Sequence, residues 1–78
     1  MRVLFFAHLR EVAGVSAAEI MAEGIVADRL WSLLIERWPT LAAHRDGTRL
    51  ARNGVYAELD AVFGNKDEVA LIPPVSGG

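Results

Sequence analysis

Two short apolar runs, one near each end of the chain, constrain the possible folds most strongly. They lie within Arg2–His8 (R-V-L-F-F-A-H) and Glu68–Ile72 (E-V-A-L-I). Valine, isoleucine and phenylalanine favour strands, and apolar residues occur at both odd and even positions of each run. We therefore predict two strands that are covered on both faces and lie in the centre of a sheet. The prolines Pro73 and Pro74 end the second strand because neither can donate a hydrogen bond to a neighbouring strand.

One long helix is predicted over Val26–Arg37. Its apolar residues, beginning with Val26, Leu30 and Leu34, recur at the spacing of a single helical face. Pro39 disfavours helical geometry at the residue before it and ends the helix there. Packing of this apolar face against a sheet is the simplest interpretation.

The segments between these elements are shorter and predict strands, turns and connections. Asn53-Gly54 is the strongest two-residue hairpin signal in the chain. We expect Val15–Glu23 to pair back on the first strand and Leu9–Gly14 to be a connection. The remaining expectations are strands over Thr48–Arg52 and Val55–Leu59, a loop with a helical turn over Thr40–Arg45, and a turn at Asn65-Lys66-Asp67.

This order of elements predicts an α+β fold of the β-grasp, or ubiquitin-like, type. If the first and last strands are adjacent, central and parallel, a mixed sheet curls round one main helix, and the crossover is right-handed. A length of 78 residues allows one domain, and 53% apolar residues are enough for a dense core. We place the domain at residues 1–74 and a flexible Gly-Gly tail at residues 75–78.

Composition excludes several classes of function. The net charge of −2 provides no clustered basic surface for nucleic acid. The absence of cysteine excludes disulfides, thiolate metal sites, a catalytic thiol and a persulfide on this chain. His8 and His44 have no partner at metal-ligand spacing, so no metal site is expected. No run is long enough to span a bilayer and no secretion signal is evident, so we expect a cytoplasmic protein that binds no membrane.

The C-terminal residues V-S-G-G are the most informative motif. Gly77 and Gly78 lack a Cβ and form the narrowest peptide that a chain can offer. Four extended residues reach at most about 14 Å beyond the domain. Val75, Ser76 and Gly77 could thread a tunnel and deliver the Gly78 carboxylate to the active site of another protein. The alternative is an ordinary frayed terminus.

The two ends of the chain together carry a family resemblance. V-L-F-F-A followed by Arg10-Glu11, and D-E-V-A-L-I-P-P-V-S-G-G at the close, resemble the small subunit of molybdopterin synthase, the MoaD type of ubiquitin-like sulfur carrier. The resemblance spans the whole chain in length and element order, whereas residues 24–59 match only in pattern. The family usually has Gly-Asp before the last strand, where this chain has Asn65-Lys66-Asp67.

The resemblance implies that Gly78 is the reactive group of a sulfur donor that is not itself catalytic. An adenylating enzyme of the ubiquitin-activating kind would use ATP to activate the Gly78 carboxylate, and sulfur would convert it to a thiocarboxylate. The sulfur would then pass to cyclic pyranopterin monophosphate in the large synthase subunit, within a heterotetramer. No permanently bound cofactor is implied.

Both partners would recognise an exposed face of the domain. The candidate docking residues are Phe6, Arg10, Leu59, Phe63, Leu71, Ile72, Pro73 and Pro74. Among the five apolar side chains before Pro73, burial in the core is the commoner role, so we expect one or two to be exposed.

Three alternatives remain open from the sequence. The chain could carry sulfur for the thiazole of thiamin or for tRNA thiolation, because such carriers share the Gly-Gly ending and the activation chemistry. It could also be a ubiquitin-like binding module with an inert tail. A free-standing enzyme is the weakest alternative, because the sequence shows no acid–base pair.

Overall fold

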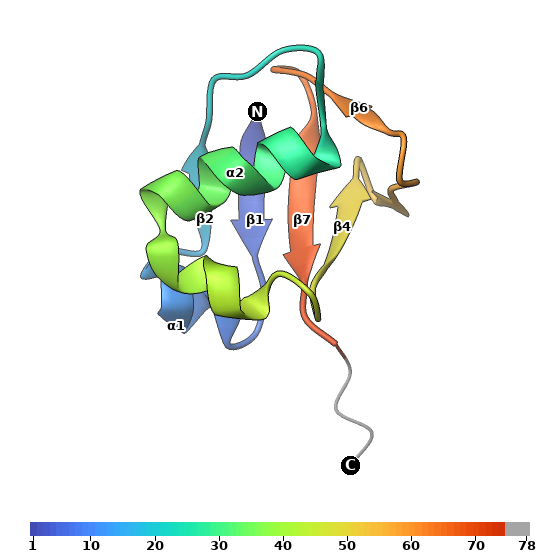
Figure 1. Ribbon diagram of the computed structural model, residues 1–78. Coiled ribbons are helices and arrows are strands. Elements are labelled where there is room, and N and C mark those ends of the chain that lie inside the picture. The colour runs from blue at the N-terminus through green and yellow to red at the C-terminus, as the bar shows by residue number, and fades with distance from the viewer. Residues whose placement is uncertain (75–78) are drawn as a thin grey trace.

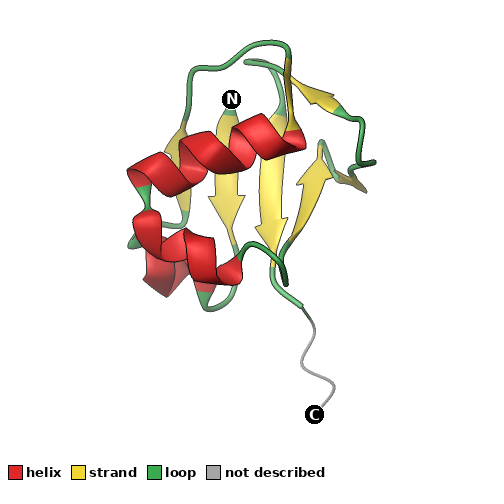
Figure 2. Cartoon of the chain, in the orientation of Figure 1, coloured by secondary structure: helices red, strands yellow, loops and turns green. Residues whose placement is uncertain are grey.

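The computed structural model describes residues 1–74, which form a curled sheet with helices on one face (Figures 1 and 2). The elements in chain order are β1 (Arg2–Phe5), α1 (Leu9–Ala13), β2 (Ala17–Glu19), β3 (Ile25–Val26), α2 (Ala27–Arg37), the 3₁₀ helix η1 (Pro39–His44), β4 (Arg49–Arg52), β5 (Val55–Tyr56), β6 (Val62–Phe63) and β7 (Glu68–Ile72). No helix within residues 1–74 is long and apolar enough to cross a membrane.

The five-stranded sheet has the order β2-β1-β7-β4-β5, with β7 at its centre. Strands β1 and β7 run parallel, from Arg2 opposite Glu68 to Phe5 opposite Leu71, and the other pairs are antiparallel. This arrangement confirms the β-grasp prediction, including the parallel central pair. A separate two-stranded ladder joins β3 to β6, and the sequence did not predict it.

Helix α2 covers one face of the sheet and closes the core (Figure 1). Leu30 and Leu34 of α2 are fully buried against β1 and β7, as the apolar periodicity predicted. The ring of Trp38 meets Phe5 edge-on, with centroids 5.0 Å apart. All residues that are buried among those described are apolar: Met1, Val3, Phe5, Leu9, Leu30, Trp31, Leu34, Leu41, Leu50, Ala51, Phe63, Val69 and Leu71.

Two local expectations are wrong and two turns are confirmed. Residues 9–13 form the helix α1 instead of a simple connection, capped by Gly14 at φ 79°. Within residues 1–74, helices cover the central strands β1 and β7 on one face only (Figure 1), so the prediction of cover on both faces is wrong for the described chain. The Asn53-Gly54 hairpin turn is confirmed, and both residues have positive φ, as a type I′ turn requires. The turn at Asn65-Lys66-Asp67 is confirmed as well.

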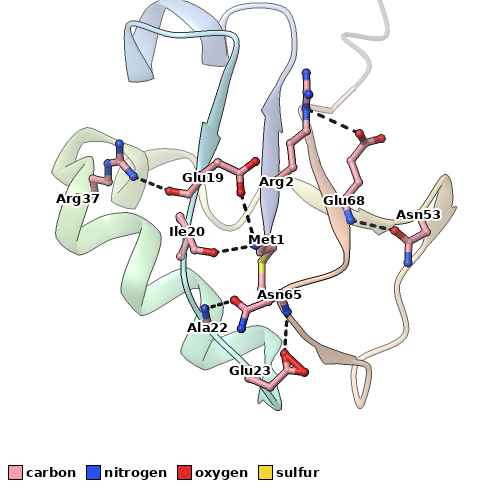
Figure 3. Close-up of polar contacts among 10 residues, drawn as sticks. All are labelled: Met1, Arg2, Glu19, Ile20, Ala22, Glu23, Arg37, Asn53, Asn65 and Glu68. Carbon is pink, nitrogen blue, oxygen red and sulfur yellow. Dashed lines mark hydrogen bonds and ion pairs between the residues drawn. The ribbon is translucent and has the colours of Figure 1, made fainter.

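Side-chain hydrogen bonds tie the loops together at the end of the sheet where β7 begins, which we call the turn end (Met1, Asn53 and residues 65–67). Asn65 accepts a bond from the backbone of Ala22, and its own backbone donates to Glu23 (Figure 3). The Asn53 amide donates to Asp67 at 2.9 Å, and its oxygen accepts from the Glu68 backbone (the latter in Figure 3).

The carboxylate of Asp67 is held in its charged form at the turn end. The Asn53 amide and the Gly64 backbone N–H both donate to it, at 2.9 and 2.8 Å. These bonds, with the charge of Arg52, hold the pKa of Asp67 below its ordinary value of 3.8. A polar side chain therefore fixes the turn that leads into the central strand.

Candidate functional site: the open sheet face and the base of the tail

Strand β7 positions the base of the tail. It ends at Ile72, and Pro73 and Pro74 leave the sheet at the end opposite to Met1, which we call the tail end (Figure 1). Pro74 lies against the loop before β4. A Cβ added at Gly47 of this loop would be 3.5 Å from the Pro74 Cγ. The tail therefore starts from a packed support. The predicted threading residues Val75, Ser76 and Gly77, and the reactive Gly78, lie outside the described residues.

An apolar depression of about 420 Å³ lies at the tail end. It is lined by Phe6, Ala7, Ile72, Pro73 and Pro74, four of which are candidate docking residues. Ala7 has a positive φ of 51°, where the chain turns sharply from β1 toward α1. Next to this turn, Phe6 is 46% exposed. The structure thus brings residues from both chain ends together around the start of the tail.

The face of the sheet that no helix covers continues this depression. Its centre consists of Leu4, Ala51, Ala70 and Ile72, which share one side of three neighbouring strands by register. Leu4, Ala70 and Ile72 are only half-buried. We call this surface, together with Phe6, the open sheet face. Because these three apolar side chains and Phe6 remain partly accessible to water, the face has the character of a protein-docking surface.

Charged residues border the open sheet face at both ends. At the turn end, Arg2 and Glu68 form an ion pair at 3.8 Å (Figure 3). At the tail end, the Arg49 guanidinium stacks over the Tyr56 ring, 3.9 Å from its centroid. An apolar centre with a polar rim is the usual anatomy of a protein interface.

Two of the predicted docking residues are wrong. Phe63 and Leu71 are 0% exposed and belong to the core, so neither can contact a partner. Leu71 points toward α2 because it alternates with Ala70 and Ile72 along β7, and Phe63 pairs with Ile25 in the second ladder. Of the five apolar candidates, Phe6, Leu59 and Ile72 retain exposed surface, which is slightly more than expected.

Leu59 and Arg10 are exposed but lie apart from the centre of the open sheet face. Leu59 is 97% exposed in the loop between β5 and β6. It lines a different depression, of about 360 Å³, together with Trp31 and Leu50. Arg10 lies on α1, three residues after Ala7, which lines the depression at the tail end. Both remain candidates for the rim of an interface.

The sequence analysis missed the proximity of the two histidines. The rings of His8 and His44 have centroids 5.3 Å apart, although 35 residues separate them in the chain. His8 follows β1 and His44 ends η1, and only the tertiary packing of α1 on η1 joins these segments. No pattern in the sequence signals this contact. Within residues 1–74 no third His, Asp or Glu joins them in a group that could hold a metal ion.

Comparisons with known proteins agree with this geometry. The model of the ThiS family matches residues 3–78. The molybdopterin synthase sulfur carrier subunit of Escherichia coli is 37% identical, with 100% of this chain and 99% of the relative covered. Small archaeal modifier protein 1 of Haloferax volcanii is 32% identical, with a TM-score of 0.75 and coverage of 96% of this chain and 97% of the other.

A third comparison is with an assembled structure. A complex of subunits 1 and 2 of the molybdopterin-converting factor of Helicobacter pylori contains a chain that matches with a TM-score of 0.74 and 26% identity. The match covers 99% of this chain and 96% of that one. Taken with the full-length family match and the β-grasp fold, these similarities show that the chain belongs to the ThiS family, among the molybdopterin synthase sulfur carrier subunits.

Proposed function

We propose that this chain carries sulfur on its C-terminal glycine and donates it within a molybdopterin synthase. The observation that carries the proposal is where the described chain ends: the central strand β7 leads into Pro73 and Pro74 at the edge of the open sheet face, and V-S-G-G follows them in the sequence. A partner that covers this face receives the tail at its own surface. The domain is then a recognition element, and Gly78 is the reacting group.

Activation of Gly78 solves a chemical problem. A free carboxylate resists nucleophiles, whereas an acyl adenylate has AMP as a good leaving group. The adenylating partner supplies this group from ATP and releases pyrophosphate. A persulfide sulfur then forms a bond to the Gly78 carbonyl carbon and the bond to the AMP oxygen breaks. A thiol cleaves the S–S bond of the resulting acyl disulfide, which leaves a thiocarboxylate on Gly78 and a disulfide on the donor. This chain needs no bound cofactor of its own for the step.

Docking on the large subunit uses the open sheet face. Phe6 and Ile72 lie beside the prolines that start the tail, so contact with them fixes the point at which the tail enters a partner. The Helicobacter pylori complex of subunits 1 and 2 supports an assembly of this kind. We propose that the large subunit and the adenylating enzyme bind overlapping parts of this face, one after the other, and that the synthase is a heterotetramer.

Intact-mass measurement tests the carrier function directly. The full chain is incubated with the adenylating enzyme, ATP, a persulfide donor and a thiol, which reduces the S–S bond of the acyl disulfide that forms first. Replacement of one oxygen by one sulfur at Gly78 is expected. A chain with one alanine added after Gly78 should fold normally and gain no sulfur, and a Gly77→Trp variant should be blocked in transfer by steric exclusion. No sulfur on the unmodified chain with a competent enzyme would refute the proposal.

A second candidate function is covalent modification of other proteins. The similarity to small archaeal modifier protein 1 favours it, because the same activated glycine can react with an amine. Incubation with the large subunit and the pterin precursor separates the two functions: a carrier loses its sulfur to the pterin, whereas a modifier forms amide-linked conjugates. Complementation of strains that lack molybdopterin, thiazole or tRNA-thiolation carriers separates this assignment from the other sulfur carriers.

A further inference from the structure

Amino groups can react with an activated Gly78 in place of the sulfur nucleophile. This chain has one lysine, Lys66, and all seven other basic side chains counted in its charge are arginines. A guanidinium stays protonated and is a poor nucleophile, whereas a lysine amine attacks activated acyl groups when it loses its proton. The positions of Lys66 and of the Met1 amino group therefore decide whether the chain can acylate itself.

Both amines lie at the turn end. Lys66 is exposed in the turn that precedes β7, and the backbone N–H of Arg2 donates to Asp67 O in that same turn. Because β1 and β7 are parallel, the start of β1 lies beside the start of β7. The amino group of Met1 donates to Ile20 O at 2.9 Å and lies 3.7 Å from the Glu19 carboxylate (Figure 3). Met1 is only 2% exposed, so its amine is occupied and shielded.

The tail begins at the opposite end of the sheet. From Glu68 to Pro74 the chain advances about 20 Å at the rise of an extended strand. Lys66 lies two residues before Glu68, in the turn at that far end. The four residues after Pro74 reach about 14 Å, and part of that length would be used in reversing direction. Gly78 therefore falls short of Lys66 of the same chain, even with an extended lysine side chain.

We infer that this fold keeps its own amines out of reach of its activated tail, and that Lys66 is the one side chain to which a second copy can be joined. The inference rests on the proposed activation of Gly78. In the reaction that is prevented in cis, the lysine nitrogen would attack the Gly78 carbonyl carbon. The C–N bond would form, the bond to the leaving group would break, and the ammonium proton would pass to solvent.

A chemically prepared thioester tests this separately from the adenylating enzyme. The full chain is produced with Gly78 as a thioester of a small thiol, so failure of enzymatic activation does not affect the result. At low protein concentration, the unmodified chain should lose the thiol only by hydrolysis. Intact mass distinguishes the products, because a lactam weighs one water less than the free acid.

Two arginine-to-lysine variants provide a matched pair. Arg49→Lys places an amine on β4 directly opposite Ile72, well within reach of the tail, whereas Arg2→Lys places one on β1 opposite Glu68, at the turn end of the same face. Intramolecular attack profits from a high effective concentration. We expect the Arg49→Lys thioester to disappear about tenfold faster or more than that of Arg2→Lys, with a peptide joining residues 49 and 78.

The outcomes either support or overturn the inference. Equal rates for the two variants, or a concentration-independent lactam of the unmodified chain on Lys66 or Met1, would overturn it. At high concentration the unmodified chain should form a dimer linked between Gly78 and Lys66, and Lys66→Arg should abolish that dimer. A dimer that persists in Lys66→Arg through the Met1 amine would show that Lys66 is not the single acceptor.

Discussion

Replacing Leu71 with alanine tests whether this side chain acts in the core or on the docking surface. Leu71 and Ile72 are adjacent on β7 and point to opposite faces of the sheet. Leu71 is 0% exposed beneath α2, whereas Ile72 is half-buried on the open sheet face. The pair therefore offers one change on each face at nearly the same place.

The expected magnitudes differ by a factor of about three. A Leu→Ala change in a packed core costs about 3 kcal/mol, because buried contacts are lost and a cavity is left. A domain of this size has a free energy of unfolding of roughly 4–12 kcal/mol, so Leu71→Ala removes a large part of it. Ile72→Ala removes three carbons that are half in water already, which costs about 1 kcal/mol.

Urea unfolding and binding measurements together check the assignment. Fluorescence of Trp31 and Trp38 follows unfolding, since both pack on or within the core. The midpoint for Leu71→Ala should fall by about 1–3 M. Ile72→Ala should bind the large subunit about fivefold to tenfold more weakly, since about 1 kcal/mol of apolar contact is lost there. Folded Leu71→Ala should bind normally.

The reasoning is refuted by either of two results. Equal destabilisation by the two substitutions would mean that the open sheet face is as buried as the core. Weaker binding by Leu71→Ala, measured at a temperature where the variant is fully folded, would show that Leu71 contributes to the docking surface. The same titrations with the adenylating enzyme show whether it uses the same face.

Three further predictions concern the turn end. Asn53→Ala should lower the free energy of unfolding by about 2 kcal/mol, because alanine is strained at φ 52° and the hydrogen bonds to Asp67 and Glu68 are lost. Urea unfolding measures this loss. Because the pKa of Asp67 is lower in the folded state, its contribution is present above pH of about 4 and is lost as the pH falls through the folded pKa. Asp67→Asn should therefore flatten the acid side of the stability profile, and an unchanged slope would contradict this. Gly64→Ala should destabilise by about 1 kcal/mol, since the new methyl group would lie 2.6 Å from the Glu23 carboxylate and displace it; equal stability would show that Glu23 moves freely.

The sequence predicts the central architecture well because the signals there are local and strong. Glu68–Ile72 is bounded by a polar turn and two prolines, and the structure has a strand over the same residues. Asn53-Gly54 requires positive φ at both positions, which few other residue pairs tolerate. The helix over residues 27–37 follows from a sustained apolar stripe.

Other features depend on tertiary contacts that leave little trace in the sequence. Helix α1 has five residues, too few for a periodic pattern, and the β3–β6 ladder has two residues on each side. Hydrophobicity alone cannot separate Phe63 in the core from Leu59 in solvent. The expectation of cover on both faces failed because Leu4 and Ile72 are apolar on a face that no part of residues 1–74 covers. Apolar residues on such a face fit a surface used for docking.

The parallel pairing of β1 with β7 also has a consequence for synthesis and folding. Its register joins Arg2 to Glu68, so the central ladder of the sheet closes almost the longest loop that this chain can form. Such non-local contacts are slow to form, and here they wait until the last strand has been made. A chain interrupted before β7 lacks the middle of its sheet and cannot hold α2 in place. The strand that completes folding is the one that leads into Pro73 and Pro74, so the base of the tail is set in place only when the domain is finished.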